Sequence, residues 1–289
     1  MRIGIIGGGK AGQALAEYFK AAGLLCGVTA STAAGSAALA QRFGTRPYDN
    51  ASLAAQADTL LLTVPDRSIA GVAAALAQDC GAAVMQGKYV LHCSGSLGLE
   101  PLAPLADCGA HTGSLHPLQS FAGGKTELAG VYMAVDGDAQ AQDCAEKIAA
   151  VLGGKAFRVP AAERAAYHAA ACICSNYAVA VEYLAQKLMS RWTGNEENAW
   201  QALLPLFRGT ANNLLRSPDA ARALTGPIGR GDISTVAKHL AVLPEKMQQP
   251  YRILGLAAAE IALANGTIDI TLAGQLQTLL RQSEVKQDD

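Results

Sequence analysis

The sequence predicts an α/β domain with a doubly wound parallel sheet, followed by an all-α C-terminal domain. Three observations support this prediction. Short apolar runs alternate with helical periodicity up to residue 160, as in a parallel sheet with crossover helices. Helical periodicity alone continues from residue 161. The chain of 289 residues is also long enough for two domains, which we expect over residues 1–160 and 161–289.

The first strand of this sheet ends in glycines, and a helix begins directly after them. Gly7, Gly9 and Gly12 stand at the spacing G-x-G-x-x-G. In a dinucleotide site the first glycine allows the sharp turn, the second lets the backbone approach a pyrophosphate, and the third lets helix and strand pack closely. The amides of Lys10 and Ala11 would lie at the positive end of the helix, where phosphates bind. The alternative is a tight turn with nothing bound.

The other elements of the first domain follow from short apolar runs bounded by Gly, Pro, Asp or Ser. Residues 59–64 are apolar on both faces, as in a central parallel strand. Gly23 is a suitable end for the first helix. After the first strand, we expect strands over residues 24–30, 59–64, 89–93, 113–116, 131–135 and 156–159, helices over residues 10–22, 35–43, 68–78 and 139–152, and a short helix near Leu53.

The end of the second strand bears on the choice of cofactor. An NAD site usually carries an Asp or Glu here to bind the ribose hydroxyls. This chain has Ser31 and Thr32 instead, whose small hydroxyls leave space for a 2′-phosphate without repelling it. NADP is therefore favoured over NAD. The arginine typical of NADP sites is missing, unless Arg42 or Arg46 reaches back.

Two further strand ends should complete the cofactor site. In an open parallel sheet, ligands bind beyond the carboxyl ends of the strands. Val64 and Pro65 end one strand, and Ser94 and Gly95 follow the next. We expect these residues along the same rim as the glycine turn.

Composition describes a compact globular protein and disfavours several partners. Hydrophobic residues make up 51% of the chain and charged residues 16%, which argues against disorder. The net charge of -1 provides no basic field for nucleic acid or an anionic membrane. We find no apolar run as long as a bilayer span and predict no metal site. Seven scattered cysteines are typical of reduced thiols in a cytoplasmic protein.

His116 is the first candidate for chemistry. A predicted strand delivers it to its end, and Pro117 fixes the turn that follows. A histidine there could exchange a proton with a substrate oxygen near neutral pH. The alternative is a histidine that hydrogen-bonds a loop carbonyl. His92 lies inside a predicted strand, and we interpret it as a satisfied core residue.

The first long helix of the C-terminal half carries three further candidates. His168 and Ser175 are nearly two helical turns apart and share a face, with Asn176 beside it. Small Ala and Cys residues between them leave room for a ligand or for a close helix neighbour. The alternative is a packing seam whose polar groups are satisfied internally.

Arg230 lies in a predicted loop rich in glycine. It could bind a substrate carboxylate or phosphate through two parallel hydrogen bonds. The alternative is an interaction with Asp232 or with a helix end that holds the loop.

These residues together carry a resemblance. The chain resembles predicted short-subunit oxidoreductases with a Rossmann-like N-terminal domain and a helical C-terminal domain of unknown function, within the wider 6-phosphogluconate and β-hydroxyacid dehydrogenase-like superfamily. The resemblance covers essentially the whole chain. It implies NADP binding in the first domain, a helical domain like that of 6-phosphogluconate dehydrogenase, and a homodimer whose helical domains intertwine. Its most specific segments are residues 7–12, 92–95, 114–121, 167–171, 175–176, 224–227 and 230–232.

Two comparisons bear on the mechanism that the resemblance implies. His116-Pro117 is similar to the histidine-proline turn of prephenate dehydrogenases, in which the histidine handles the substrate hydroxyl proton. The β-hydroxyacid dehydrogenases carry a catalytic lysine on the first inter-domain helix, followed four residues later by asparagine. This chain has no lysine between Lys155 and Lys187, so the lysine mechanism cannot be transferred to it.

We therefore expect an NADP-dependent oxidoreductase that moves a hydride between the nicotinamide and a small anionic carbonyl, hydroxyl or imine substrate. His116 or His168 would supply the proton, Ser175 and Asn176 would orient the substrate, and Arg230 would bind its anionic group. The alternative is a sensor or regulatory scaffold that binds NADP without turnover.

Overall fold

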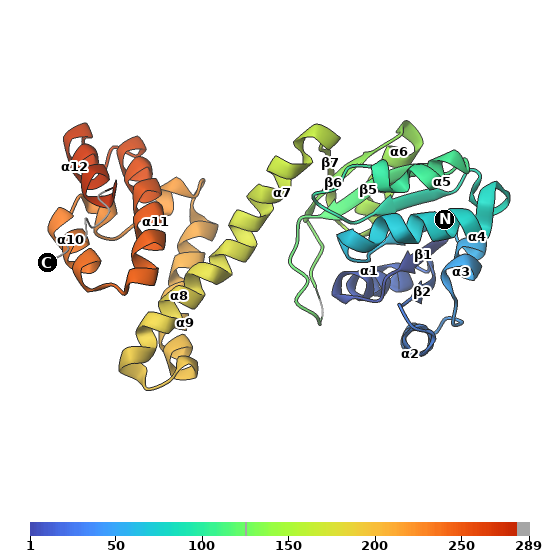
Figure 1. Ribbon diagram of the computed structural model, residues 1–289, viewed down its shortest axis with the longest axis horizontal. Coiled ribbons are helices and arrows are strands. Elements are labelled where there is room, and N and C mark those ends of the chain that lie inside the picture. The colour runs from blue at the N-terminus through green and yellow to red at the C-terminus, as the bar shows by residue number, and fades with distance from the viewer. Residues whose placement is uncertain (125, 282–289) are drawn as a thin grey trace, which may run out of the picture. The chain divides into compact units, whose positions relative to one another are not determined.

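The structure is a computed structural model that describes residues 1–124 and 126–281. It divides into two compact units, Met1–Ala178 and Val179–Asp289. The first unit is built on one sheet with helices around it, and the described part of the second unit is helical (Figure 1). The predicted fold class, a doubly wound sheet followed by an all-α part, is confirmed.

A seven-stranded sheet with the order β2-β1-β3-β4-β5-β6-β7 forms the centre of the first unit. Its strands are β1 (Ile3–Ile6), β2 (Leu25–Thr29), β3 (Thr59–Leu62), β4 (Tyr89–His92), β5 (His111–Pro117), β6 (Tyr132–Gly137) and β7 (Lys155–Arg158). Neighbouring strands are parallel except β5 and β6, which are antiparallel. The strand order reverses direction at β1, so the gap between the ends of β1 and β3 is the position where such sheets bind ligands.

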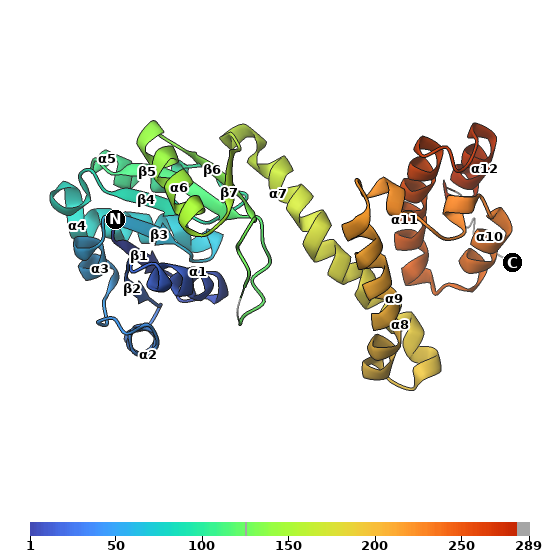
Figure 2. The same ribbon diagram turned by 180° about the vertical axis from the view of Figure 1, so that it is seen from behind.

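Helices cover both faces of this sheet (Figure 2). They are α1 (Lys10–Ala21), α2 (Ala33–Phe43), α3 (Asn50–Gln56), α4 (Asp66–Met85), α5 (Ala103–Asp107) and α6 (Ala139–Val151). Alternate strand residues point to opposite faces. Ile5 and Leu61 therefore pack with α1, α2 and α6, while Leu60 and Leu62 pack with α3, α4 and α5.

Helix α4 is longer than the predicted helix over residues 68–78. By length and composition alone it could cross a membrane, a feature that our search of the sequence did not identify. Its apolar side chains Ile69, Ala73 and Leu76 are buried against the sheet. Gly81 interrupts its backbone with φ 57°.

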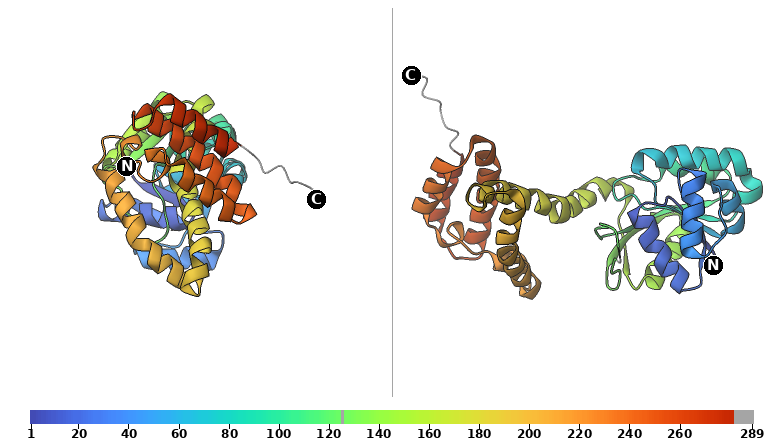
Figure 3. Two further views of the ribbon diagram at one scale, coloured as in Figure 1. Left: turned by 90° about the vertical axis from the view of Figure 1, so that its left-hand side faces the viewer. Right: turned by 90° about the horizontal axis from the view of Figure 1, so that it is seen from below.

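The described part of the second unit consists of helices (Figure 3, yellow to red). They are α8 (Ala178–Thr193), α9 (Glu196–Arg216), α10 (Ile233–Val242), α11 (Glu245–Ala264) and α12 (Ile270–Arg281). The core of this unit lies among α10, α11 and α12, where Val236, Ala259 and Leu276 are completely buried.

Helix α7 (Arg164–Cys172) belongs to the first unit. The reason is Arg164, whose side chain is completely buried in the first unit. The division between the two compact units falls after Ala178. This is later in the chain than the expected boundary between residues 1–160 and 161–289. As a division into domains, the boundary at residue 160 stays a prediction.

Two glycines bring α1 directly onto the ends of β1 and β3. A Cβ atom on Gly12 would collide with the carbonyl oxygen of Gly7 and would lie 2.5 Å from Oγ1 of Thr63. Gly7 has φ 121°, a region that other residues rarely adopt. The helix can approach this closely only because both positions lack a side chain.

Replacing Gly12 with Ala tests this packing. We expect Gly12→Ala to lower the free energy of unfolding by about 3 kcal/mol, because the added methyl group meets rigid backbone. Gly9→Ala is the control, since a Cβ there meets nothing within 4 Å, and it should cost less than about 1 kcal/mol. Urea unfolding followed by circular dichroism measures both values, and equal losses would contradict the packing.

Candidate functional site

The glycine turn leaves the start of α1 open to a ligand. Gly9 is the N-cap of α1, and no side chain in the described part of the protein caps this helix. The first backbone amides of a helix, here those of Lys10 and Ala11, have no partner within the helix. Together with the open space beside Gly9, they form a cradle that fits a phosphate group.

The end of β2 presents the hydroxyl groups expected there. Ser31 and Thr32 are exposed, and the Thr32 hydroxyl also caps α2 by accepting a hydrogen bond from the amide of Gly35 at 3.1 Å. The two nearby arginines have other partners. Arg42 pairs with Glu17 on α1 at 3.0 Å, and the guanidinium of Arg46 lies over the ring of Tyr48, 5.7 Å from its centre.

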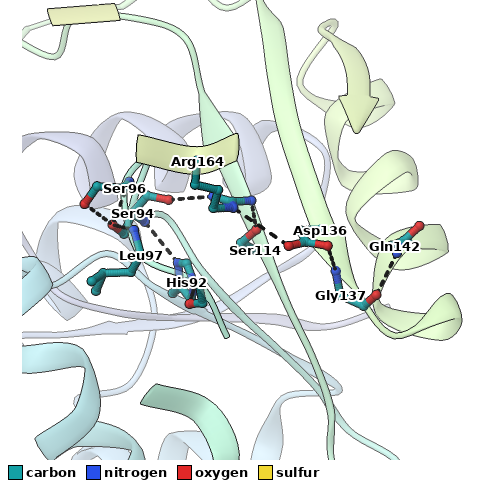
Figure 4. A network of polar contacts seen from close by, with 10 residues as sticks. His92, Ser94, Ser96, Leu97, Ser114, Asp136, Gly137, Gln142 and Arg164 are labelled. Carbon is teal, nitrogen blue, oxygen red and sulfur yellow. Dashed lines mark hydrogen bonds and ion pairs between the residues drawn. The ribbon is translucent and has the colours of Figure 1, made fainter. Parts of the chain in front are cut away.

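The ends of β3 and β4 are tied together through Asp66. Val64 and Pro65 follow β3 and lead into α4, whose N-cap is Pro65. The hydroxyl of Ser94 donates to Oδ2 of Asp66 at 2.7 Å, and its oxygen accepts the amide of Leu97 at 3.1 Å. The side chain of Ser94 therefore shapes the loop after β4 (Figure 4).

His92 is the satisfied core histidine that we expected. Its Nδ1 accepts the amide of Ser94 at 3.2 Å, so the proton is on Nε2, which donates to the carbonyl of Gly98 at 2.9 Å. The side chain is completely buried. Burial lowers the pKa of His92 to about 4, so the ring is neutral.

A buried arginine joins the loop after β4 to two further strands, as Figure 4 shows. The guanidinium of Arg164 donates to the carbonyl of Ser94 at 3.1 Å and to the hydroxyl of Ser114 on β5. Its Nε lies 3.9 Å from Oδ2 of Asp136 on β6. We did not predict Arg164 as a site residue. Its spacing of four residues before His168, which places both on one helix face, was the signal available in the sequence.

His116 and His168 meet above Gly95. Their ring centres are 6.0 Å apart. A Cβ atom on Gly95 would lie 2.6 Å from Cδ2 of His168 and 2.9 Å from Nε2 of His116. The structure therefore brings two predicted catalytic residues to a residue of the predicted cofactor site, and only a glycine leaves room for both rings.

Tyr167, another residue that we did not predict, contacts His116. Its hydroxyl lies 2.7 Å from Nδ1 of His116. Burial lowers the pKa of His116 to about 4, and the neighbouring His168 and Arg164 lower it further. Burial raises the pKa of Tyr167 to about 12. Near neutral pH, both side chains are therefore uncharged.

A pocket of about 530 Å³ borders these side chains, within the first unit. Its lining includes His116, Tyr167, His168, Ser175 and Asn176. The last two belong to a π-helical turn, η3 (Ile173–Tyr177), directly after α7. Such turns are frequent at functional sites. Four of the predicted catalytic residues thus line one pocket.

Arg230, the fifth predicted catalytic residue, belongs to the second unit. It ends a short 3₁₀ helix, η5 (Ile228–Arg230), and is exposed. Asp232 does not pair closely with it but caps α10 by accepting the amide of Thr235 at 3.0 Å. The hydroxyl of Thr235 also donates to Asp232, at 2.7 Å. The hydrogen bonds from the hydroxyl and amide of Thr235, and more weakly the charge of Arg230, lower the pKa of Asp232. The role of Arg230 toward a substrate stays a prediction.

The sheet order, the glycine turn and the helical second unit define a protein with a Rossmann-like domain and a helical C-terminal domain. Residues 1–117 match the family described as Rossmann-like domain. Residues 131–258 match the family described as Domain of unknown function (DUF2520). No curated protein matches this chain.

Solved structures share this fold over nearly the whole chain. A Bacteroides fragilis protein, whose name provisionally assigns it to the NADP oxidoreductases, is 20% identical with a TM-score of 0.72, over 90% of this chain and 98% of its own. A Thermotoga maritima protein is 24% identical with a TM-score of 0.69, and the match covers 91% of this chain and 99% of that protein. A reductive aminase from Aspergillus terreus, solved with NADPH and ethyl-5-oxohexanoate, is 16% identical with a TM-score of 0.57, over 96% and 92%.

Replacing Arg164 tests whether it holds the site together. We expect Arg164→Met to lower the free energy of unfolding by about 3 kcal/mol, because it leaves buried acceptors without their donor. Arg42→Met is the control, since its ion pair with Glu17 is half exposed, and it should cost less than about 1 kcal/mol. Urea unfolding measures both variants. A similar cost for the two would refute this role of Arg164.

The buried histidines predict an acid-sensitive fold. Both His92 and His116 have pKa values near 4 in the folded protein, against about 6.5 in an unfolded chain. Between these values the unfolded chain binds protons first, so stability is full above about pH 6.5 and falls as the pH drops. Because two histidines contribute, we expect the free energy of unfolding to decrease by about 2 kcal/mol per pH unit in this range. A flat profile in urea titrations from pH 6.5 to 4 would contradict it.

Proposed function

We propose that this protein is an NADP-dependent oxidoreductase that transfers a hydride between the nicotinamide and a small carbonyl, hydroxyl or imine substrate. The observation that carries the proposal is the meeting of His116 and His168 over Gly95. This pair lies at the carboxyl ends of the strands, beside a pocket, where such sheets bind ligands. The names of the structures with the same fold, an NADP oxidoreductase and a reductive aminase with NADPH, support it.

The residues of the first unit fit a bound dinucleotide. We assign the pyrophosphate to the amides of Lys10, Ala11 and Gly12, because Gly9 leaves this approach open. The hydroxyls of Ser31 and Thr32 suit a 2′-phosphate better than an acidic side chain would. When bound, the reduced nicotinamide would supply the hydride.

The nicotinamide end of the cofactor would lie along the neighbouring strand ends. Val64 and Pro65 follow β3 and Gly95 follows β4, so their backbone borders the rim on which the two histidines lie. Gly7 contributes indirectly, because its turn packs on the backbone at Thr63 and Val64. Ser94 acts through its side chain, which holds the loop in shape.

The pocket would bind the substrate. Charge develops on the substrate oxygen or nitrogen as a hydride is added to the neighbouring carbon, so a proton donor has to lie within hydrogen-bond reach. His116 or His168 would fill this role. Ser175 and Asn176, in the π-helical turn of the same pocket, would orient the substrate, and Arg230 would bind an anionic group on it.

We further propose a cytoplasmic homodimer related to the 6-phosphogluconate dehydrogenase-like proteins. Two observations support a dimer through the helical unit. Helix α8 has no buried residue, and large apolar side chains on α8 and α9 are exposed, among them Val179, Trp192, Leu206 and Leu215. A second copy of the chain is the partner that the resemblance implies. All seven cysteines are free thiols, in keeping with a reducing compartment.

Cofactor titration tests the proposed function. We expect the protein to bind NADPH at least about tenfold more tightly than NADH, and Ser31→Asp to reverse this order, because a carboxylate repels the 2′-phosphate and accepts hydrogen bonds from ribose hydroxyls. Thr271→Asp is the control, since it adds the same charge at an exposed site of the second unit. Cofactor fluorescence measures the affinities.

Turnover distinguishes an enzyme from a binding protein. Oxidation of NADPH, followed by absorbance with a panel of aldehydes, ketones, oxo acids and cyclic imines, should reveal at least one substrate. NADPH binding without turnover on any of them would favour the sensor alternative. Tighter binding of NADH than of NADPH would contradict the assignment of Ser31 and Thr32.

A further inference from the structure

Three neighbouring side chains of α7 reach the candidate site, and Tyr167 is the one that contacts a predicted catalytic residue by a hydrogen bond. Its hydroxyl is 2.7 Å from Nδ1 of His116, and the two rings lie edge to face with their centres 5.6 Å apart. Arg164 precedes Tyr167 by three residues and His168 follows it directly, so all three lie within two turns of α7. Tyr167 is therefore held in place by the contacts that fix α7.

The direction of the hydrogen bond between Tyr167 and His116 depends on their protonation and on the strength of each as a donor and an acceptor. Burial keeps the phenol of Tyr167 protonated and the imidazole of His116 neutral. Within residues 1–124 and 126–281, Nδ1 of His116 is the acceptor bonded to this hydroxyl. A phenol O–H is a stronger hydrogen-bond donor than an imidazole N–H, and an imidazole nitrogen is a stronger acceptor than a phenol oxygen. The favoured direction therefore runs from Tyr167 to Nδ1 of His116, which leaves Nδ1 without a proton. The single proton of the neutral ring is then on Nε2.

The Nε2 atom of His116 lies on the side of the ring that faces the loop after β4. It is the ring nitrogen near Gly95, 2.9 Å from where a Cβ atom on that residue would be. No protein group in the described part of the chain forms a hydrogen bond with it, and His116 lines the pocket. This N–H is thus available to a ligand.

We propose that Tyr167 is a positioning residue that fixes His116 as the Nε2–H tautomer, and that this N–H donates a hydrogen bond to the carbonyl oxygen or imine nitrogen of the substrate. Only the donor role of Nε2–H rests on the proposed function; the tautomer assignment does not. It assigns the donor role to His116 rather than His168, whose Nδ1 faces the thiol of Cys172 at 3.8 Å.

The same arrangement accounts for the proton in carbonyl reduction. When a hydride from the reduced nicotinamide adds to the carbonyl carbon, the π-electron pair moves to oxygen, which takes the proton from Nε2. The electron pair left on the ring allows Nδ1 to accept the hydroxyl proton of Tyr167. The products are the alcohol, a neutral imidazole protonated on Nδ1, and a phenolate. A solvent proton taken up at Nε2 then lets Nδ1 return its proton to the phenolate, which restores the starting tautomer. The charge of Arg164 favours this phenolate, against the opposing and larger effect of burial.

Nitrogen NMR of histidine tests the tautomer without any substrate. In protein labelled with ¹⁵N-histidine, we expect wild-type His116 to show a protonated Nε2 and an unprotonated Nδ1 at pH 7. Tyr167→Phe keeps the ring but loses the donor, so His116 should become a mixture of both tautomers. Tyr183→Phe, at an exposed position on α8, should leave the spectrum unchanged. A proton on Nδ1 in the wild type would overturn the proposal.

Kinetics tests the second half of the inference. We expect Tyr167→Phe to lower kcat by about tenfold to a hundredfold, with the KM and the affinity for NADPH within about twofold of wild type. The kcat of wild type should stay level down to about pH 5, because burial keeps the ring of His116 neutral there. His168, Arg164 and His92 lower its pKa further, and the carboxylate of Asp66 opposes them.

The outcomes separate the two proposals. An unchanged kcat in Tyr167→Phe would overturn the positioning role, whatever the tautomer. The expected tautomer together with no turnover on any substrate would overturn the oxidoreductase proposal and the donor role, and would leave the tautomer assignment standing.

Discussion

The geometry of the candidate site depends on one buried guanidinium group. Arg164 spans the loop after β4, the middle of β5 and the carboxylate of Asp136 on β6. Its side chain is completely buried, and burial lowers its pKa. Removing a charge from water is costly unless several partners replace the water. The arginine is therefore held in one position, and α7 is held with it.

The rest of the site follows from helical spacing. Tyr167 and His168 lie three and four residues after Arg164, so they face the same side of α7. Once the arginine is anchored between β4 and β5, the tyrosine reaches His116 and the histidine reaches Gly95. A glycine at that position is needed because two rings occupy the space of its side chain. The anchored arginine thus positions the contacts of both Tyr167 and His168.

The sequence predicts the fold and part of this site, and the reasons for its limits are physical. Periodicity depends on local burial, so the alternating elements and the glycine turn can be read directly. His116, with its strand-end proline, was also visible as a candidate. Arg164 and Tyr167 were not predicted. Helical spacing could place Arg164 on the same face as His168, but the hydrogen-bond partners of Arg164 and Tyr167 lie 50 or more residues away, and spacing along the chain does not report such contacts. Contact of Ser94 with the cofactor stays a prediction, and the structure adds that its side chain bonds to Asp66.

The same environment bears on the absence of a lysine from α7. A lysine can both carry a positive charge and give up a proton, whereas a guanidinium keeps its protons at any ordinary pH. Arg164 supplies the charge but is committed to Ser94 and Ser114. That charge, with burial, disfavours an imidazolium at His116. In the proposed reaction, the proton for the substrate would then come from a neutral N–H or O–H group, and His116 and Tyr167 form a hydrogen-bonded pair of such groups at the pocket.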